Sequence, residues 1–256
     1  MSVRANDPAC PLTRAVTAER FDAVLFDLDG VLTDTASVHA RCWKQVFDEV
    51  LARRARGDAA RPFDVQHDYL RYVDGKPRLD GVRDFLRSRG LELPEGGEGD
   101  ARDADTVRAI ARRKNALIET ALVSGEVDVY PGSVRWLDAL REQALRTAVV
   151  SSSHHCAEVL EAAGLADRFD VRVDGNLIDA RGLPGKPAPD AFLEAARALD
   201  VAPARAVVVE DASAGVRAGR AGGFGLVVGV ARHDNASDLS AAGADLVVYD
   251  LAEMLS

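Results

Sequence analysis

Two carboxylates, Asp27 and Asp29, follow the apolar run 23–26 with a single residue between them. Such a run is typical of a strand buried on both faces, and ligands collect at the carboxyl ends of such strands in open parallel sheets. Residues i and i+2 of an extended chain point to the same side, and Gly30 permits a sharp turn after them. A carboxylate placed there can attack phosphorus and form an aspartyl phosphate, so we assign the nucleophilic role to Asp27. The alternative is a strand that simply ends in a polar turn.

Two later positions carry side chains that can support this chemistry. Ser151 closes the run 148–150, and its hydroxyl can donate to phosphate oxygens at the start of the helix that follows. Lys186 precedes Pro187, which we expect to open a helix and so to place the ammonium where it offsets negative charge. Both have ordinary alternatives, because a serine that ends a strand is commonly a helix cap and a Lys-Pro pair is commonly a surface turn.

An acidic pair, Glu210 and Asp211, closes the apolar run 207–209. Asp27 and an incoming phosphate repel each other, so the site needs a cation. Magnesium takes hard oxygen ligands, typically one or two carboxylates together with substrate phosphate. Taken alone, the acidic pair also fits a helix N-cap with an acidic neighbour.

Four features in this order resemble the four signatures of the haloacid dehalogenase superfamily of phosphotransferases. They are the Asp27-Leu28-Asp29-Gly30-Val31 segment, Ser151, the Lys186-Pro187-Ala188-Pro189-Asp190 segment and the Glu210-Asp211 pair. The stretch from Asp27 to Asp34, continued by Thr35, His39 and Trp43, is similar to the β-phosphoglucomutase group and its phosphatase relatives. The resemblance runs from about residue 21 to residue 251 and is weakest over 53–106.

The resemblance implies a magnesium cofactor and roles for the acidic residues. Asp27 and Asp211 would be side-chain ligands of the metal, and the backbone carbonyl of Asp29 would add a third oxygen. Glu210 would orient a metal-bound water. The Asp29 side chain would be the general acid and base on the opposite side of phosphorus.

The same resemblance implies substrate-binding residues, several of them in an inserted cap. Arg78 matches the cap arginine that binds a distal phosphate, and Ser153 and His155 match core residues that bind the same phosphate. Lys114 matches a cap lysine that contacts the substrate. Thr35 and His39 match residues at the cap entrance that position Asp29.

Three of these positions leave alternatives open. His39 lies one helical turn before Trp43 on an apolar stripe, where a satisfied interfacial histidine is as good an interpretation. Arg78 also fits a solvated charge, and the turn before it has an additional Pro and Lys relative to the family pattern. His155 stands where an amide side chain is usual.

Composition narrows the function classes. The 256 residues include 41 Asp plus Glu against 32 Lys plus Arg, which disfavours a general nucleic-acid or membrane-surface role, since both need a basic face. The spacing of the three cysteines is typical neither of disulfide pairs nor of metal ligands. We therefore expect Cys10, Cys42 and Cys156 to be free thiols of a protein in a reducing compartment. No apolar run approaches the roughly 18 residues of a membrane span. We expect a cytoplasmic monomer whose partner is a small phosphorylated sugar.

Valine-rich runs alternate with segments of helical period along the chain. The runs lie at 22–27, 146–151, 169–173, 205–210, 224–229 and 245–248. This pattern predicts an α/β fold: a Rossmann-like, doubly wound, mostly parallel sheet. Residues 28–145 separate the first two strands, which is too long for a single crossover, so we expect an inserted domain there.

The insert reads as helical. Val38, Cys42, Val46 and Val50 recur every fourth residue, a second helix is expected over about 79–90 and a third over about 104–124, with an acidic loop at 92–105. Pro131 is expected at the first position of the helix that returns to the core. The predicted domains are a loose tail at 1–20, an α/β core at 21–34 plus 130–256, and a helical cap at 35–129.

The leading hypothesis is a magnesium-dependent mutase that converts β-glucose 1-phosphate to glucose 6-phosphate through an aspartyl phosphate and the 1,6-bisphosphate. A phosphatase of small sugar phosphates shares every core residue and differs in letting water attack the phosphorylated Asp27. A catalytically silent sugar-phosphate-binding protein is the alternative of another class.

Overall fold

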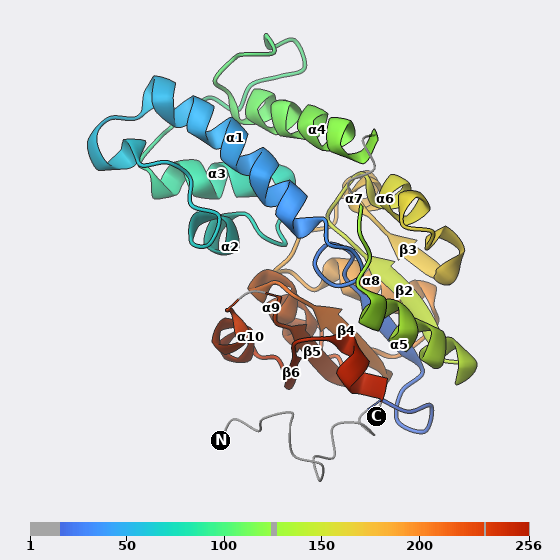
Figure 1. Ribbon diagram of the computed structural model, residues 1–256. Helices are drawn as coiled ribbons and strands as arrows, with labels where there is room; N and C mark the ends of the chain where they lie inside the picture. The colour runs from blue at the N-terminus through green and yellow to red at the C-terminus, as the bar shows by residue number, and fades with distance from the viewer. Residues whose placement is uncertain (1–15, 124–126, 233, 256) are drawn as a thin grey trace. The chain divides into compact units, whose positions relative to one another are not determined.

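A computed structural model describes residues 16–123, 127–232 and 234–255, and most of its helices and strands are labelled in Figure 1. The chain divides into two compact units, Met1–Asp34 with Asp128–Ser256, here called the core unit, and Thr35–Val127, here called the insert. Most of the predicted tail, including Cys10, lies outside the described residues. Residues 17–21 form a turn in which the backbone N–H groups of Arg20 and Phe21 donate to the Thr17 carbonyl oxygen.

The core unit is built on one parallel sheet with the strand order β3-β2-β1-β4-β5-β6. All six predicted strands are present, so the expected α/β class is confirmed. Their bounds are β1 Ala23–Phe26, β2 Arg146–Val150, β3 Val171–Val173, β4 Ala206–Glu210, β5 Leu226–Val230 and β6 Leu246–Val248.

Helices cover both faces of this sheet. On one face, α8 (Asp190–Ala198) packs on β1, β2 and β3, and α9 (Ser213–Ala221) packs on β4 and β5. On the other face, α5 (Pro131–Glu142) packs on β2, and its Trp136 meets Phe26 of β1 with ring centroids 5.4 Å apart. Pro131 is the first residue of α5, as predicted. The remaining core helices are α6 Cys156–Ala162, α7 Gly175–Arg181 and α10 Ala236–Ala242, with short 3-10 turns at Ala166–Arg168, Pro203–Arg205 and Leu251–Leu255.

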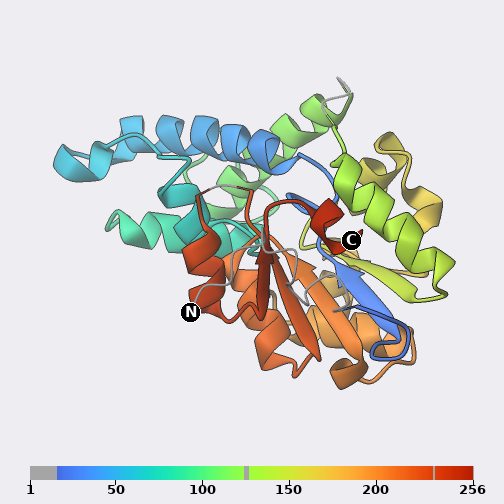
Figure 2. The ribbon, with the colours of Figure 1, turned by 60° about the horizontal axis from the view of Figure 1, so that its bottom comes forward.

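Strand order reverses direction between β1 and β4, which lie side by side in the middle of the sheet. Figure 2 shows β1 in blue beside the orange strands of the C-terminal half. In doubly wound sheets this is the switch point, and ligands bind at the carboxyl ends of the strands there. The fold therefore brings together the residues that follow β1 and β4.

The two segments that lead into and out of the insert pair with each other. The Asp34 N–H donates to the Asp128 carbonyl oxygen at 2.8 Å, and the Tyr130 N–H donates to the Leu32 carbonyl oxygen at 3.0 Å. Thr33 and Val129 form an antiparallel bridge between these bonds. We call residues 32–34 and 128–130 the linker ribbon. The chain thus leaves and re-enters the core unit at adjacent points.

The insert consists of α1 (Ala36–Arg54), α2 (Asp68–Tyr72), α3 (Arg78–Ser88) and α4 (Val107–Val123), with a 3-10 turn at Gly57–Ala60. The predicted stripe is buried, and Phe47 at its centre meets Trp43, Phe63 and Phe85 with ring centroids 5.0, 5.1 and 4.2 Å away. The three predicted helices are present. The sequence pattern missed α2, because five residues are too few to show a helical period.

The predicted acidic loop before α4 is also present and is fixed to the insert by Asp105. Arg53 Nη2 and Arg54 Nε of α1 donate to Asp105 at 2.7 and 2.6 Å. Burial alone would raise the pKa of this carboxyl, but the hydrogen bonds from Arg53 and Arg54 outweigh burial and lower the pKa. The ionised form of Asp105 therefore stabilises the fold.

We expect Asp105→Asn to lower the free energy of unfolding by about 1–3 kcal/mol at neutral pH, because hydrogen bonds to a charged partner are lost. A group whose pKa is lower in the folded than in the unfolded state stabilises the fold above its unfolded pKa, and this stabilisation disappears as pH falls through the folded pKa. Urea unfolding at pH 7 and at pH 3 measures this, and the difference between wild type and variant should shrink at pH 3. Asp58→Asn, an exposed change, is the control.

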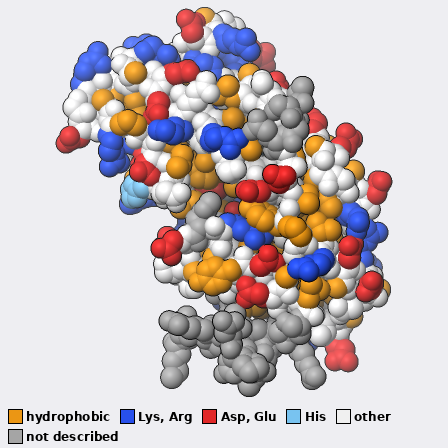
Figure 3. Space-filling view, viewed as in Figure 1, with side chains coloured by type: hydrophobic (Ala, Val, Ile, Leu, Met, Phe, Trp, Pro, Cys, Tyr) orange, Lys and Arg blue, Asp and Glu red, His pale blue; other side chains and the backbone are white. Residues whose placement is uncertain are grey.

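Charged side chains of both signs are interspersed on the face shown in Figure 3, with no broad basic area. This agrees with the acidic balance of the sequence. Within the described ranges, no helix combines the length and the apolar character needed to cross a bilayer.

Candidate active site

Three carboxylates meet where β1 and β4 end. Asp27 follows β1, Glu210 ends β4 and Asp211 comes next, and one oxygen of each lies within 4.8 Å of the others. The Asp27 N–H donates to the Val209 carbonyl oxygen at 2.9 Å, which continues the β1–β4 pairing to this point. All three residues are buried, with exposed fractions of 7%, 0% and 6%. Buried acids at such density need cations.

Lys186 supplies a positive charge inside this cluster. Its ammonium donates to Asp27 Oδ1 at 2.5 Å, to Glu210 Oε1 at 2.6 Å and to the Val150 carbonyl oxygen at 3.1 Å. Our prediction that Pro187 opens a helix is wrong, because α8 begins at Asp190. A residue that precedes proline is kept out of the helical region, and Ala188 precedes Pro189, so the helix starts only after the second proline. Lys186 lies in the turn before the helix.

Burial and charge set the protonation of this pair. Burial raises the pKa of the Asp27 carboxyl well above its usual range, Lys186 opposes the shift, and Glu210 and Asp29 add to it. Burial also disfavours the charged form of Lys186, but Asp27 and Glu210 outweigh burial and raise the pKa of the ammonium. Lys186 is therefore a cation at physiological pH.

The donor set suits a hard divalent cation. Carboxylate oxygens from Asp27, Glu210 and Asp211 are the ligands that magnesium prefers. Two glycines make room for this geometry: a Cβ on Gly30 would lie 1.8 Å from Asp211 Oδ2, and a Cβ on Gly215 would lie 1.7 Å from Glu210 Oε1. Asp27 and Asp211 would hold the metal, with the Asp29 carbonyl oxygen as a further ligand.

Gly30→Ala is expected to displace the Asp211 carboxylate, since the added carbon has no space and the φ angle of +86° already strains any other residue. The magnesium concentration that gives half-maximal activity should rise about tenfold or more. Gly223→Ala is the matched control, because its φ is +68° but nothing lies within 4 Å of an added Cβ. Equal magnesium dependence in both variants would contradict this account of Gly30.

Asp29 and Ser151 face each other beside the carboxylate cluster. The Ser151 hydroxyl donates to Asp29 Oδ2 at 3.5 Å, and Ser151 is 1% exposed. We expected Ser151 at the start of a helix, but α6 begins only at Cys156. Residues 152–155 form a turn instead, in which the Ser153 N–H donates to Ser151 Oγ at 3.1 Å and the His155 N–H donates to Ser153 Oγ at 3.2 Å. Side-chain acceptors occupy these backbone N–H groups, which delays the helix.

The remaining predicted site residues belong to the insert. Thr35 is the N-cap residue of α1 and is 2% exposed, and Arg78 is the first residue of α3. Lys114 Nζ lies 3.1 Å from His39 Nδ1 and 5.3 Å from the centroid of the Trp43 ring. The insert therefore brings His39 and Lys114 together. An uncharged His39 can accept this hydrogen bond at Nδ1 and present its Nε2–H as a donor.

Asn235 is a residue that sequence reasoning missed. Its Nδ2 donates to the Asp211 carbonyl oxygen at 3.1 Å, and it is 6% exposed. The side chain thus fixes the backbone of one of the three clustered acids. Neither its residue type nor its distance in sequence from Glu210 and Asp211 marks it as a site residue, so only the fold reveals this contact.

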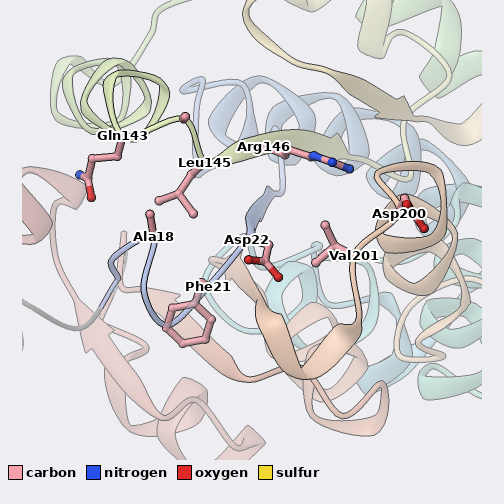
Figure 4. A pocket seen from close by; sticks show the side chains of 9 residues that line it. Ala18, Phe21, Asp22, Gln143, Leu145, Arg146, Asp200 and Val201 are labelled. Atoms are coloured by element: carbon pink, nitrogen blue, oxygen red, sulfur yellow. The ribbon is translucent and has the colours of Figure 1, made fainter.

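A separate pocket lies at the opposite edge of the sheet. Figure 4 shows Phe21, Leu145 and Val201 around it, together with Asp22 before β1 and Arg146 at the start of β2. Its volume is about 390 Å³. Because Asp27 follows the other end of β1, this pocket is not part of the carboxylate site.

Comparison with known proteins agrees with this geometry. The sequence pattern of the haloacid dehalogenase-like hydrolases matches residues 21–223. The chain is 50% identical over 243 residues to a protein named β-phosphoglucomutase from Mycobacterium bovis, covering 93% of this chain and 92% of that one. It is 28% identical to fructose-1-phosphate phosphatase YqaB of Escherichia coli, covering 82% and 96%.

Among solved structures, β-phosphoglucomutase from Clostridium difficile is similar in fold, with a TM-score of 0.71, 24% sequence identity and coverage of 91% of this chain and 93% of that one. The order of the four signatures, the parallel sheet and the match over residues 21–223 agree. The chain therefore belongs to the haloacid dehalogenase-like hydrolase family and resembles the β-phosphoglucomutases within it.

Proposed function

We propose that this protein is a magnesium-dependent mutase that converts β-glucose 1-phosphate to glucose 6-phosphate through a phosphorylated Asp27. The observation that carries the chemistry is the buried cluster of Asp27, Glu210 and Asp211, in which the Lys186 ammonium pairs with Asp27 and Glu210. The 50% identity to a protein named β-phosphoglucomutase, over nearly the whole chain, supports this substrate.

In the proposed reaction, an Asp27 oxygen attacks phosphorus of the 1,6-bisphosphate, and the bond from phosphorus to the sugar oxygen breaks. Asp29 gives its proton to that oxygen, and later takes a proton from the hydroxyl that attacks the phosphorylated Asp27. The Lys186 ammonium stabilises the charge that develops on the transferred group. Bound magnesium would supply further positive charge to the phosphoryl oxygens.

On the core unit, we propose that Ser151, Ser153 and His155 donate to phosphate oxygens. On the insert, we propose that Arg78 binds a phosphate in a bidentate manner and that Lys114, His39 and Thr35 contact the sugar phosphate.

Phosphorus NMR tests the proposal. The wild-type protein is incubated with magnesium, β-glucose 1-phosphate and a trace of the 1,6-bisphosphate, with Asp27→Asn as the inactive control. We expect glucose 6-phosphate to accumulate with little inorganic phosphate. If inorganic phosphate is the main product, the protein is a phosphatase and the mutase proposal is refuted. If neither product forms, both activities on this sugar are refuted.

The phosphatase is the second candidate function, because the chain is also similar to a fructose-1-phosphate phosphatase. It uses the same Asp27, Asp29 and Lys186 and differs only in the acceptor, which is water. A catalytically silent binding protein would bind sugar phosphate without forming a phosphorylated Asp27 from any donor.

Asp29→Asn separates the proposed acid and base step from nucleophilic attack. The asparagine cannot supply a proton, so turnover of the sugar phosphate should fall by about 10²–10⁴-fold. Phosphorylation of Asp27 by acetyl phosphate should fall much less, because its leaving group needs no proton. Rapid-quench measurement of both reactions provides the comparison, and equal losses would refute the role of Asp29.

A further inference from the structure

Arg232, two residues after the end of β5, lies outside the four signatures but contacts the loop that carries Asp29. Its Nε donates to the Gly30 carbonyl oxygen at 2.7 Å. Nη2 donates to the Val31 carbonyl oxygen at 3.3 Å and to Ser133 Oγ at 3.4 Å. Ser133 is fully buried and itself donates to the Val31 carbonyl oxygen at 2.6 Å. The guanidinium therefore binds two consecutive peptide groups of this loop.

The flat face of the same guanidinium covers the linker ribbon. Its central carbon lies 3.5 Å from the centroid of the Tyr130 ring, which is close cation–π contact. The Tyr130 hydroxyl donates to Asp34 Oδ1 at 3.0 Å, so Tyr130 ties the two strands of the ribbon together through its side chain as well as its backbone. One residue thus holds both the loop after β1 and the returning segment.

The fork of donors and the stacked face both require arginine. The acceptors are neutral, since Nη1 donates to the Tyr249 carbonyl oxygen at 3.2 Å and no described carboxylate forms an ion pair with Arg232. A surface salt bridge is therefore not its role. Lysine would keep the charge but could not bind Gly30 and Val31 while stacking on Tyr130.

The position of Gly30 connects this contact to the reaction. The peptide group before Gly30 contains the Asp29 carbonyl oxygen, and the Asp211 carboxylate lies against the Gly30 Cα, where a Cβ would be 1.8 Å from Oδ2. A shift of Gly30 would therefore move the Asp29 carbonyl and disturb Asp211 at once.

We propose that Arg232 is a positioning residue that holds the Asp29–Val31 backbone, and through Gly30 the Asp211 carboxylate, in the arrangement that binds magnesium and aligns Asp29. The kinetic part of this inference rests on the proposed phosphoryl transfer. The structural part concerns the backbone of residues 28–34 and the Asp211 carboxylate, and it applies to any activity of the site.

The test compares Arg232→Met and Arg232→Lys with Arg220→Met, a control that removes an exposed ion pair with Asp245. Amide hydrogen exchange of residues 28–34 is followed in metal-free protein, and magnesium binding is measured by calorimetry. We expect Arg232→Met to accelerate exchange at least tenfold and to weaken magnesium binding about tenfold, the scale for loss of a group that orients a ligand. Arg232→Lys should lie between, and Arg220→Met should match wild type.

Tyr130→Leu leaves the guanidinium but removes both the stacked ring and the hydroxyl that donates to Asp34, whereas Tyr130→Phe removes only the hydroxyl. Tyr130→Leu should accelerate exchange in the same segment more than Tyr130→Phe does, which keeps the test decisive if Arg232→Met fails to fold. In active protein, Arg232→Met should lower kcat more than it raises KM, because alignment rather than substrate binding is lost.

Exchange and magnesium affinity in Arg232→Met equal to those of Arg220→Met would overturn the proposal. If the wild-type protein binds magnesium but transfers no phosphoryl group, the proposed function is refuted. Hydrogen exchange and calorimetry still test the role of Arg232 in that case. The two failures are therefore distinguishable.

Discussion

Asp27→Ala is expected to abolish both glucose 6-phosphate formation and phosphate release, with kcat falling by about 10⁴–10⁶-fold. Both activities depend on this carboxylate, because a covalent intermediate on Asp27 is common to transfer and hydrolysis in the proposed reaction. The variant should remain folded. Burial raises the pKa of Asp27, which means that its charged form is unfavourable in the folded state, and Lys186 keeps Glu210 as a partner.

Steady-state assays of both products and a thermal melt measure this prediction. Asp22→Asn is the control, because Asp22 is an exposed acid at the opposite end of β1 that pairs with Arg205. It should retain wild-type turnover. Surviving activity in a folded Asp27→Ala protein would show that another residue is the nucleophile.

Lys186→Met should have the largest effect on stability. It leaves the Asp27 and Glu210 carboxylates buried without the ammonium that lies 2.5 and 2.6 Å from them. Removing one partner of a buried ion pair typically costs 3–5 kcal/mol, so we expect the free energy of unfolding to fall by about this amount in metal-free buffer. Magnesium should recover part of the loss, because it binds the folded state and adds positive charge to the same cluster.

Urea unfolding with and without magnesium measures both effects. Lys44→Met is the control: its ammonium pairs with Asp48 at 2.8 Å, but the lysine side chain is 43% exposed. Exposed pairs contribute about 1 kcal/mol or less. Comparable destabilisation in the two variants would mean that the ion pairs of Lys186 do not hold the cluster together.

The residues that follow strands were accessible to prediction because their signal is local. Asp27 follows an apolar run, Glu210 and Asp211 close another, and the parallel sheet brings the ends of β1 and β4 together. Their convergence needs only the strand order that the α/β pattern favours. The helix starts near Ser151 and Lys186 were predicted wrongly because they depend on turn chemistry, namely serine acceptors in one case and a second proline in the other.

Long-range support could not be predicted in this way. Arg232 contacts Gly30 across 202 residues, and Asn235 contacts Asp211 from a different loop. Nothing in the spacing of these residues indicates a partner. Such contacts depend on which strands become neighbours and on how far each loop extends, so they emerge only from the three-dimensional arrangement.

The linker ribbon has a consequence for how such a chain can diversify. The Asp34 N–H donates to the Asp128 carbonyl oxygen at 2.8 Å, so the two points of the core unit between which the insert is connected are adjacent and hydrogen-bonded to each other. The entropic cost of bringing the two ends of a segment together rises only slowly with the length of that segment. Recombination at this junction can therefore exchange one insert for another of different length while the sheet keeps its register. The insert and the sheet can then change in sequence and in length independently of each other.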